Sequence, residues 1–392
     1  MEKTKVKTLV RQIRGVSYKP EDLHNELDDN SVVLLRANNI DEGKINFDDV
    51  VYVDKSKVSD EQYLKYGDIL ICASSGSKNL VGKAASIRFS KECTFGAFCK
   101  AIRPKEGLDE YLSVYFQSPI YRRKISEVAI GVNINNIRNE HIDELDIPVF
   151  SNDEQASIVK KIHLIQEVIS NRKAELEKLD DLIKARFVEM FGDAVDNPMG
   201  WEKRQLQEIV TDDCTISYGI VQTGDDQEEG VPVFRPVDIV NRVPKLDELK
   251  KTTEEISNKY KRTVLKGREM LITVRANIAD TYIIGEEFKG CNVGRGIVPI
   301  RTKEDIMVLE FLKYLMDSKH LNDKIKSKAK GITLIQLNME DLREVELIVP
   351  PLEQQKVFVE FANQVNKSKF AVQKTLEQTQ TLFDSLMQKY FG

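Results

Sequence analysis

The sequence predicts an α+β protein in which two similar α+β domains alternate with two long helices that form an antiparallel coiled coil, a pseudo-twofold internal repeat. Three observations predict it. A heptad-like apolar pattern runs through the otherwise polar residues 151–192, and the pattern returns 200 residues later, at 351–392. Before each stretch come short apolar runs separated by Gly, Asn, Asp and Ser, which are typical of strands and turns. We therefore expect a first domain at 1–150, a central helix at 151–192, a linker and second domain at 193–350, and a C-terminal helix at 351–392.

The repeat extends beyond the helices. Residues 131–192 align with residues 331–392 at a constant offset of 200 and without gaps, and the start of the chain aligns with residues 202–210 at the same offset. The alignment also covers stretches that are not helical, so chance similarity between two amphipathic helices does not explain it. The identical positions include the following pairs: Gly131 and Gly331, Glu140 and Glu340, Gln155 and Gln355, Leu176 and Leu376, and Phe191 and Phe391.

Composition indicates an ordinary water-soluble protein. The 392 residues are 41% hydrophobic and 31% charged, no run reaches the ~20 apolar residues of a membrane helix, and the N-terminus has no signal-peptide pattern. Five cysteines without CxxC spacing favour reduced, buried thiols and a cytoplasmic location. The net charge is −5, so a nucleic-acid-binding surface would need its positive charge concentrated on one face.

In the first domain, strands are predicted at 31–35, 69–72, 84–89 and 98–102. A helix is expected at 111–118, ending before Pro119, and a second one at 120–128. Residues 142–149 form a strand or an extended entry into the long helix.

The central helix begins with a capping box, in which Ser151 is followed three residues later by Glu154. Its apolar stripe is interrupted once, by Arg172, and it is too narrow to stay uncovered. The C-terminal helix, with Lys369 and Thr379 as interruptions, is the expected partner; the alternative is that each helix packs separately on its own domain. The central stripe comprises Ile158, Ile162, Ile165, Ile169, Leu176, Leu179 and Ile183, and the C-terminal one Phe358, Ala362, Val365, Val372, Leu376, Phe383 and Leu386.

The second domain repeats the pattern of the first. Strands are predicted at 231–234, 269–274, 282–284 and 296–300, and a helix at 307–316. Residues 192–200 form the linker between the two copies.

Motifs for catalysis are missing. The sequence has no phosphate-binding GxxxxGK[ST] loop, no GxGxxG after a strand and no GxSxG, and its four histidines lack metal-ligand spacing. Residues 197–200 (NPMG) only partly match a methyltransferase motif and are interpreted as a turn. Glu175, Glu177 and Lys178 are interpreted as a solvated helix face rather than as a nuclease site. We expect the chain not to be an enzyme.

Polar and basic loops at matching places in both halves are the candidate binding site. Their side chains are of the types that pair with base edges and phosphates in DNA. One such loop is an ordinary surface feature, but recurrence in both halves favours DNA binding. The candidates are Arg11, Arg14, Tyr18, Lys19, Arg36, Asn38, Asn39, Ser74, Ser75, Ser77, Lys78 and Asn79 in the first half, and Arg235, Arg275, Asn277, Arg295, Lys328 and Lys330 in the second.

Several phrases together resemble the specificity subunit of type I restriction–modification enzymes, and the resemblance covers the whole chain. The phrases are FVEMFGDAVDNPMGWEKRQLQEI at 187–209, GDIL at 67–70, GVNINNIRNEHIDELDIPV at 131–149 and GITLIQLNMEDLREVELIVPPLEQQ at 331–355. Residues 267–269 (GRE) depart from the Gly-Asp-Ile form found at Gly67.

The resemblance implies that the globular parts are target-recognition domains, each reading one half of a bipartite site in double-stranded DNA. The helices would form the spacer and dock two modification (methyltransferase) subunits, and two restriction (translocase and nuclease) subunits would join for cleavage. S-adenosylmethionine, ATP and Mg would be bound by those partners, so no cofactor or metal is expected in this chain, and no membrane is involved.

An antiparallel helix pair would place the two domains on successive major grooves, roughly 34 Å apart. Helix length would then set the separation of the half-sites. Two alternatives remain open: a scaffold that never reads DNA, and a fused methyltransferase or nuclease, which the missing motifs disfavour.

Overall fold

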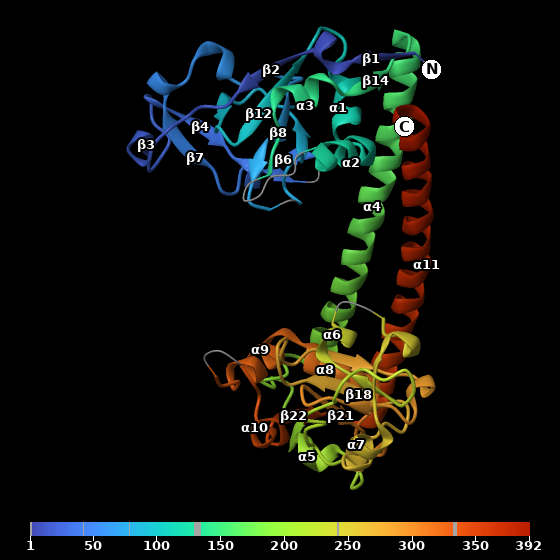
Figure 1. The fold of residues 1–392 in the computed structure, drawn as a ribbon. Helices are drawn as coiled ribbons and strands as arrows, with labels where there is room; N and C mark the ends of the chain where they lie inside the picture. The colour runs from blue at the N-terminus through green and yellow to red at the C-terminus, as the bar shows by residue number, and fades with distance from the viewer. Residues whose placement is uncertain (1, 42, 78, 129–134, 241–242, 332–334) are drawn as a thin grey trace. The chain divides into compact units, whose positions relative to one another are not determined.

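The chain forms two compact units, each containing part of both long helices. A computed structural model describes residues 2–41, 43–77, 79–128, 135–240, 243–331 and 335–392 (Figure 1). Unit 1 comprises the chain up to residue 174 together with residues 373–392, and unit 2 comprises residues 175–372. Because this division cuts each long helix, the domain limits expected from the sequence remain a prediction.

Unit 1 is built on two four-stranded sheets, with strand orders β10-β8-β12-β2 and β11-β4-β7-β3. Apolar side chains of both sheets form one core between them, and helices α1 and α2 bury aromatic side chains such as Tyr115 and Phe116 in a second core. The strands are β1 Lys3–Lys5, β2 Val10–Arg14, β3 Leu23–His24, β4 Ser31–Leu35, β5 Ile40–Asp41, β6 Lys44–Ile45, β7 Val51–Asp54, β8 Ile69–Cys72, β9 Ser74–Ser75, β10 Ala84–Ser86, β11 Cys93–Phe95, β12 Cys99–Pro104, β13 Asn135–Asn136 and β14 Asp146–Pro148, and the helices α1 Asp109–Phe116, α2 Pro119–Val128 and α3 Asn139–Asp143.

Unit 2 repeats this plan with two three-stranded sheets, ordered β17-β16-β20 and β19-β18-β21. Helices α8 and α9 take the place of α1 and α2, and the ribbon β15–β22 takes the place of β1–β14. The strands are β15 Glu202–Gln205, β16 Val231–Phe234, β17 Lys250–Thr252, β18 Met270–Thr273, β19 Thr281–Ile283, β20 Asn292–Val293, β21 Ile297–Ile300 and β22 Glu346–Val349, and the helices α5 Leu206–Ile209, α6 Pro236–Ile239, α7 Glu254–Asn258, α8 Leu309–Asp317, α9 Lys319–Ser327 and α10 Met339–Arg343.

The long helices are α4 (Asn152–Phe191) and α11 (Leu352–Phe391), and their bounds differ by 200 residues at both ends. They run antiparallel: in unit 1 the start of α4 shares a core with the end of α11, and in unit 2 the end of α4 shares a core with the start of α11. Ile162 packs in the same cluster as Met387, and Phe187 in the same cluster as Phe358. The predicted helix pairing is therefore confirmed, and the alternative of separately packed helices is wrong.

One interruption of the apolar stripe, Lys369, is accommodated by an ion pair. Lys369 is half-buried and forms an ion pair with Asp180 of the other helix. The capping box at the start of α4 is also present: the backbone N–H of Glu154 donates to the Ser151 hydroxyl at 3.4 Å, and the backbone N–H of Ser151 donates to Glu154 Oε2 at 2.9 Å. The pKa of the Glu154 carboxylate is lowered because the carboxylate accepts hydrogen bonds from the hydroxyl and the backbone N–H of Ser151.

Several predicted elements have different limits in the structure. The strands at 31–35, 69–72 and 231–234 have the predicted bounds, whereas the strand expected at 84–89 ends at Ser86. The segment 142–149 begins as the end of helix α3 and becomes extended only at β14. Arg11 and Arg14 were expected in a loop, but they lie on edge strand β2, which pairs with β12.

All five cysteines are buried and free, as the sequence suggested. Within the described part of the chain, no helix is both long enough and apolar enough to cross a membrane.

Candidate nucleic-acid interface

Five chain segments of unit 1 meet where strands of both sheets end, and we call this place the loop junction of unit 1. The segments are 14–19 after β2, 36–39 after β4, 73–77 after β8, 96–98 between β11 and β12, and 135–137 before α3. Backbone hydrogen bonds join them, so their relative positions are fixed by the main chain. These bonds run from Val16 N to Phe95 O, from Gly96 N to Leu35 O, from Ala73 N to Phe98 O and from Ile137 N to Ala73 O, at 2.8 to 2.9 Å.

Unit 2 has the same backbone network, which defines its own loop junction: segments 218–222, 235–238, 274–277, 294–296 and 336–337. The junctions correspond bond by bond, although the intervening sequences differ. The equivalent bonds run from Ile220 N to Val293 O, from Gly294 N to Phe234 O, from Val274 N to Gly296 O and from Leu337 N to Val274 O, at 2.8 to 3.0 Å.

The side chains carried by these matching backbones are different. Gly15 lies against the carbonyl groups of Phe95 and Gly96, and Gly219 lies against those of Val293 and Gly294, so the two glycines are equivalent. The offset between the two units is therefore 204 residues at this place rather than 200. The arginines lie at different places in the two units: unit 1 has Arg14 where unit 2 has a tyrosine, and unit 2 has Arg275 and Arg295 where unit 1 has a serine and an alanine. The equivalent positions are Arg14 and Tyr218, Ser74 and Arg275, Ala97 and Arg295, Phe98 and Gly296, and Asn136 and Gln336.

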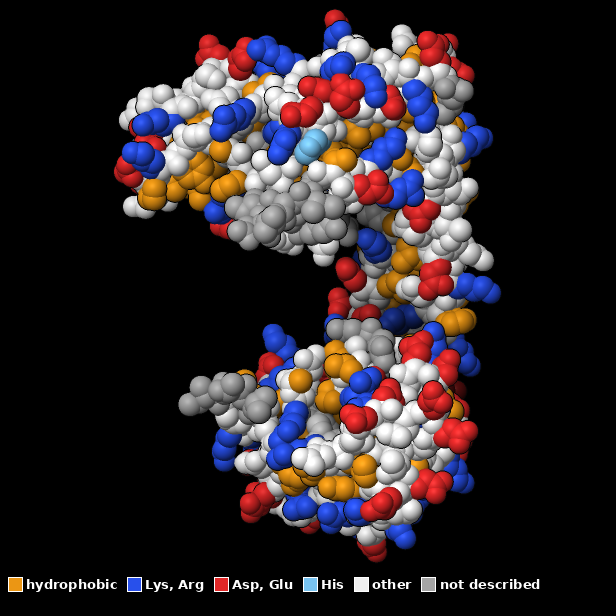
Figure 2. All heavy atoms as spheres, in the orientation of Figure 1, with side chains coloured by type: hydrophobic (Ala, Val, Ile, Leu, Met, Phe, Trp, Pro, Cys, Tyr) orange, Lys and Arg blue, Asp and Glu red, His pale blue; other side chains and the backbone are white. Residues whose placement is uncertain are grey.

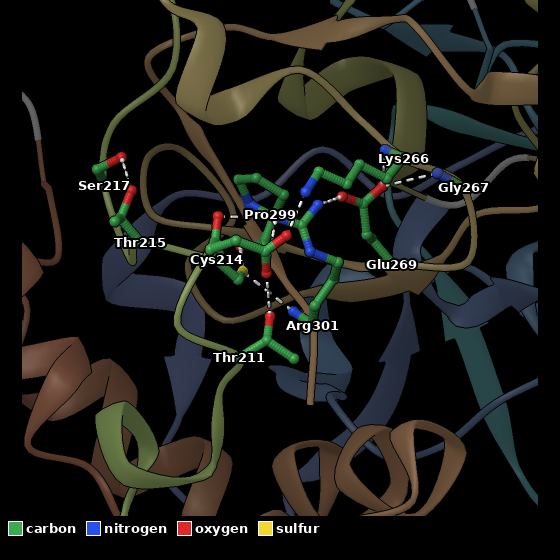
Figure 3. Close-up of polar contacts among 10 residues, drawn as sticks. Thr211, Cys214, Thr215, Ser217, Lys266, Gly267, Glu269, Pro299 and Arg301 are labelled. Atoms are coloured by element: carbon green, nitrogen blue, oxygen red, sulfur yellow. Dashed lines mark hydrogen bonds and ion pairs between the residues drawn. The ribbon is translucent and has the colours of Figure 1, made fainter. Parts of the chain in front are cut away.

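Each loop junction is anchored from the far end of the same strand pair. In unit 2, Arg301 lies just after β21 and Glu269 just before β18, and Arg301 Nη1 donates to Glu269 Oε1 at 2.6 Å (Figure 3). In unit 1, Arg103 forms a two-pronged contact with Asp68 at 2.7 and 2.9 Å. The strand pairs are about four residues long, so these ion pairs lie about 13 Å from the loop junctions. In each unit an arginine bonded to a buried carboxylate thus fixes the strand register that positions the loops.

The departure at residues 267–269 is explained by this anchor. The loop before β18 has the same length as the loop before β8, and Arg268 adopts a positive φ of 54° at the place where unit 1 has Gly67, with a φ of 91°. Glu269 takes the place of Asp68: its Oε2 accepts from the backbone N–H of Lys266 at 2.8 Å, as Asp68 Oδ2 accepts from that of Lys65 (Figure 3).

Segment 211–217 of unit 2 replaces strand β2. Its four extra residues bulge, and the buried thiol of Cys214 donates to Pro299 O at 3.3 Å and accepts from Arg301 N at 3.2 Å (Figure 3). Burial raises the pKa of this thiol, which favours the neutral form that makes both contacts. Because of this insertion, the residue of unit 2 that is equivalent to Arg14 of unit 1 is Tyr218 and not Cys214.

Three of the candidate arginines pair with acidic side chains of their own unit. Arg36 donates to Asp49 at 2.9 Å, and Arg11 pairs with Glu61. Arg235 forks onto the fully buried Asp238 at 3.0 and 3.1 Å, a hydrogen bond that raises the pKa of the guanidinium. Arg36 and Arg235 occupy equivalent positions, and each shapes its own loop.

Three other arginines have no acidic partner among the described residues: Arg14, Arg275 and Arg295. The pKa of Arg275 is lowered, mainly by burial and in addition by the positive charge of the neighbouring Arg295. Arg295 also stands over the ring of Tyr218, with 6.0 Å from its guanidinium carbon to the ring centroid. Unit 2 thus concentrates uncompensated positive charge at its loop junction.

The remaining candidates near β2 and β4 differ in exposure. Tyr18 is half-buried and Lys19 is exposed beside Glu21. Asn38 is exposed and donates to Asp49 at 2.8 Å. Asn39 is only 1% exposed, and its side chain donates to the backbone carbonyl of Asn46 and accepts from the backbone N–H of Arg36. It is therefore a structural residue in this conformation.

The serine-rich loop lies at the unit 1 junction. Ser74 and Ser75 form β9, which pairs with Asn135–Asn136, and both are half-buried. Ser77 and Asn79 are exposed, and Lys78 lies outside the described residues.

In unit 2, Asn277 is exposed two residues after Arg275. Lys328 ends α9 half-buried, and exposed Lys330 lies 3.8 Å from Asp341 and bridges to Gln336 through its backbone. Lys330 and Arg275 thus bridge to the same residue, Gln336.

Three residues of the loop junctions were not among the candidates predicted from the sequence: Tyr218, Gln336 and Phe98. Phe98 is 67% exposed, which is unusual for a phenylalanine. Tyr218 and Gln336 carry no motif; only the two-unit comparison of backbone bonds identifies them. On the face that Figure 2 shows, basic and acidic side chains are interspersed over each unit, so no single-sign face is seen there. Among the described residues, no group of three or more His, Cys, Asp or Glu side chains is arranged to hold a metal ion.

Comparison with known proteins matches this geometry to a family. The model of the type I restriction modification DNA specificity domain matches twice, at residues 18–179 and 198–379. The chain belongs to this specificity-domain family. Similar relatives include the type I restriction enzyme StySPI specificity subunit of Salmonella potsdam, 29% identical over 409 residues (98% of this chain and 86% of the relative). The EcoKI specificity subunit of Escherichia coli strain K12 is 37% identical over 203 residues, which is 52% of this chain and 44% of that relative.

Solved structures support the same fold for this member of the specificity family. The type I restriction–modification S subunit of M. genitalium covers all of the chain with a TM-score of 0.55 at 14% identity, and 96% of that subunit is matched. A chain from a structural study of type I system assembly and conformational transition gives a TM-score of 0.60 at 19% identity, with 100% and 97% coverage. The specificity-family fold thus includes two globular domains and paired long helices, as predicted.

Proposed function

We propose that this chain is the DNA-reading subunit of a type I restriction–modification complex, with each loop junction reading one half of a bipartite duplex site. One observation carries the proposal: the two junctions share a backbone network but differ in side chains. A common frame with different base-contacting groups is what two different half-sites require, because sequence is read by side chains at base edges. The curated relatives bear the name specificity subunit over nearly the whole chain, which supports the same role.

The residues proposed to face DNA are those at the junctions without internal acidic partners, together with the exposed polar groups beside them. Arg14, Ser74 and Phe98 lead in unit 1, and Arg275 and Arg295 lead in unit 2. Arg11, Arg36 and Arg235 are assigned to the frame of the domains, because acidic neighbours already satisfy them.

Two matching grooves support docking of two copies of one partner. In unit 2 a groove of about 960 Å³ is bordered by strand β19, helix α8 and both long helices. In unit 1 a groove of about 820 Å³ is bordered by the equivalents β10, α1 and both long helices. Glu110 and Glu310, and Gln166 and Asn366, occupy matching places in them. Equivalent grooves fit two equivalent subunits, which we assign to two methyltransferase subunits.

The reactions are assigned to partner subunits. S-adenosylmethionine would be bound by the methyltransferase subunits, and ATP and Mg by two restriction subunits that join for cleavage. The chain would act in the cytoplasm, where its DNA targets are.

The test is reconstitution of the chain with its methyltransferase subunits, followed by sequencing of the methylated sites in a random DNA library. We expect one bipartite motif with two specified halves and an unspecified spacer, and DNA affinity that falls with rising salt. Methylation without sequence preference, or no DNA binding by the complex, would favour a scaffold instead. Methyl transfer by the chain alone would contradict the assignment of catalysis to partners.

A further inference from the structure

Arg275 is held in place from both sides of its backbone. It lies two residues after the end of β18 and bridges to Gln336 as an antiparallel pair. Its neighbour Val274 donates to Gly296 O at 2.9 Å and accepts from Leu337 N at 3.0 Å. The Cα of Arg275 is thereby fixed at the loop junction of unit 2.

The guanidinium is also fixed, through a chain of side-chain hydrogen bonds. Arg275 Nε donates to Gln336 Oε1 at 2.7 Å, and Arg275 Nη2 contacts the same oxygen. Gln336 Nε2 in turn donates to the hydroxyl of Tyr218 at 2.6 Å. Among the described residues, Nη1 has no hydrogen-bond partner, so the end-on edge formed by Nη1 and Nη2 keeps donors free.

The charge of this group is left for an outside partner. Arg235, in the same unit, is neutralised by buried Asp238, whereas Arg275 has Arg295 as its charged neighbour and no described carboxylate. Two neighbouring guanidinium groups repel one another unless an anion or a strong acceptor approaches them. A rigid arginine with two free donors in one plane fits two acceptors side by side.

We propose that Arg275 reads a guanine in the half-site of unit 2, donating to its O6 and N7, with Gln336 and Tyr218 as positioning residues. This inference rests on the proposed function and makes it specific. Guanine presents two adjacent acceptors in the major groove, and the arginine fork is its commonest partner. Arg295, exposed over the Tyr218 ring, is assigned to the neighbouring phosphate. Unit 1 has Ser74 and Asn136 at the equivalent places, so its half-site is read differently.

The experiment compares complexes that carry the wild-type chain, Arg275→Gln, Arg275→Lys and Tyr218→Phe, each with its methyltransferase subunits. Methylated sites are sequenced from a random library, and thermal unfolding checks that each variant folds. Arg204→Ala removes the same charge from β15, where Arg204 pairs with Glu202, and is the matched control.

Arg275→Gln should lose the preference for one G·C pair in one half-site, a fall in discrimination of about 5- to 150-fold. The other half-site should be unchanged. Arg275→Lys keeps the charge but loses the fork and should relax the same position partly. Tyr218→Phe keeps the ring and removes the hydroxyl, so it should relax that position too, while Arg204→Ala should match the wild type.

Two results would overturn the inference while leaving the proposed function intact. One is an unchanged motif in Arg275→Gln and Arg275→Lys. The other is a uniform loss of affinity for all sequences with a reduced salt dependence, which would make Arg275 a phosphate contact. Absence of any bipartite motif in the wild-type complex would instead refute the proposed function.

Discussion

A β-carbon added to Gly15 would lie closer than 3.0 Å to the carbonyl oxygen of Gly96, a separation that real β-carbons do not show. The same relationship holds in unit 2 between Gly219 and Val293. Both glycines sit where two segments of a loop junction cross, so each junction depends on the absence of a side chain.

Gly15→Ala should therefore disturb the junction of unit 1 and lower the free energy of unfolding by about 1–3 kcal/mol, as overpacking does. Specificity for one half-site should weaken while the other half-site is retained. Urea unfolding and sequencing of methylated sites measure the two effects. Gly76→Ala is the control, because nothing lies within 4 Å of a β-carbon there. Equal behaviour of the two variants would contradict the prediction.

Arg301→Ala should destabilise unit 2 by about 3–5 kcal/mol, because it leaves the fully buried Glu269 carboxylate without its cation. Replacing both residues by methionine should cost much less, since no buried charge remains. Denaturant titration of the two variants gives the comparison. A loss below about 1 kcal/mol for Arg301→Ala would show that the pair does not anchor the strands.

Asp213 should contribute to the free energy of unfolding in a way that depends on pH. Its hydrogen bond with Lys266 lowers its pKa from 3.8 to about 2, so the charged form favours the folded state. This contribution is present above pH ~4 and is lost as the pH falls towards 2. Asp213→Asn should reduce stability at pH 6, by no more than about 1 kcal/mol because the group is half-exposed, and the difference should vanish near pH 2.

Asp212→Asn is the control for that titration. The Asp212 side chain is 98% exposed and lies 3.6 Å from Lys303. Because the side chain is exposed, this variant should change the free energy of unfolding at pH 6 by less than about 0.5 kcal/mol. A pH-independent effect of Asp213→Asn would mean that its charge is not responsible.

Phe98→Ala should relax the half-site of unit 1 and leave stability within about 0.5 kcal/mol, because the ring is 67% exposed. The aromatic ring at the loop junction would contact an apolar feature of the DNA, such as a thymine methyl group. Methylation of a library measures the motif, and thermal unfolding measures stability. A strongly destabilised protein would instead identify Phe98 as a core residue.

Helix length can be tested by insertion, because α4 and α11 each contribute to both units. One heptad inserted after Lys173 and another after Gln373 preserve the apolar stripe and add about 10 Å to each helix, about three base-pair steps. We expect the unspecified spacer of the methylated motif to lengthen accordingly. Five-residue insertions rotate the stripe by about 140° and should impair folding. An unchanged spacer with the heptads would refute the hypothesis.

Much of the fold follows from the sequence because strong local patterns agree with the tertiary structure. The strands at 31–35 and 69–72 are short apolar runs bounded by polar residues, and both are fully buried. Strand β2 was missed because its sequence, VRQIR, contains three polar residues among five and resembles a basic loop. Pairing with β12 decides its conformation, and that partner is about 90 residues away in the sequence.

The candidate site was only partly predictable for a related reason. Residue type placed Arg275 and Arg295 among the candidates, but it did the same for Asn39, which the fold buries. Tyr218 was not found because four inserted residues shift the repeat locally, and a constant offset pairs it with Tyr18 instead of Arg14. Which arginines have acidic neighbours depends on loops distant in sequence, such as the one that brings Asp49 to Arg36.

The sharing of both long helices between the two units has a consequence for the order of synthesis. Phe383, Met387 and Phe391 belong to the core of unit 1 but are translated after all of unit 2. At 5–20 residues per second, on the order of 10 to 40 s separate the synthesis of residue 174 from that of Phe391. Unit 2, complete at residue 372, can therefore mature before the unit that was started first. Until then the nascent N-terminal portion exposes an uncovered apolar stripe, which makes it a natural client for chaperones.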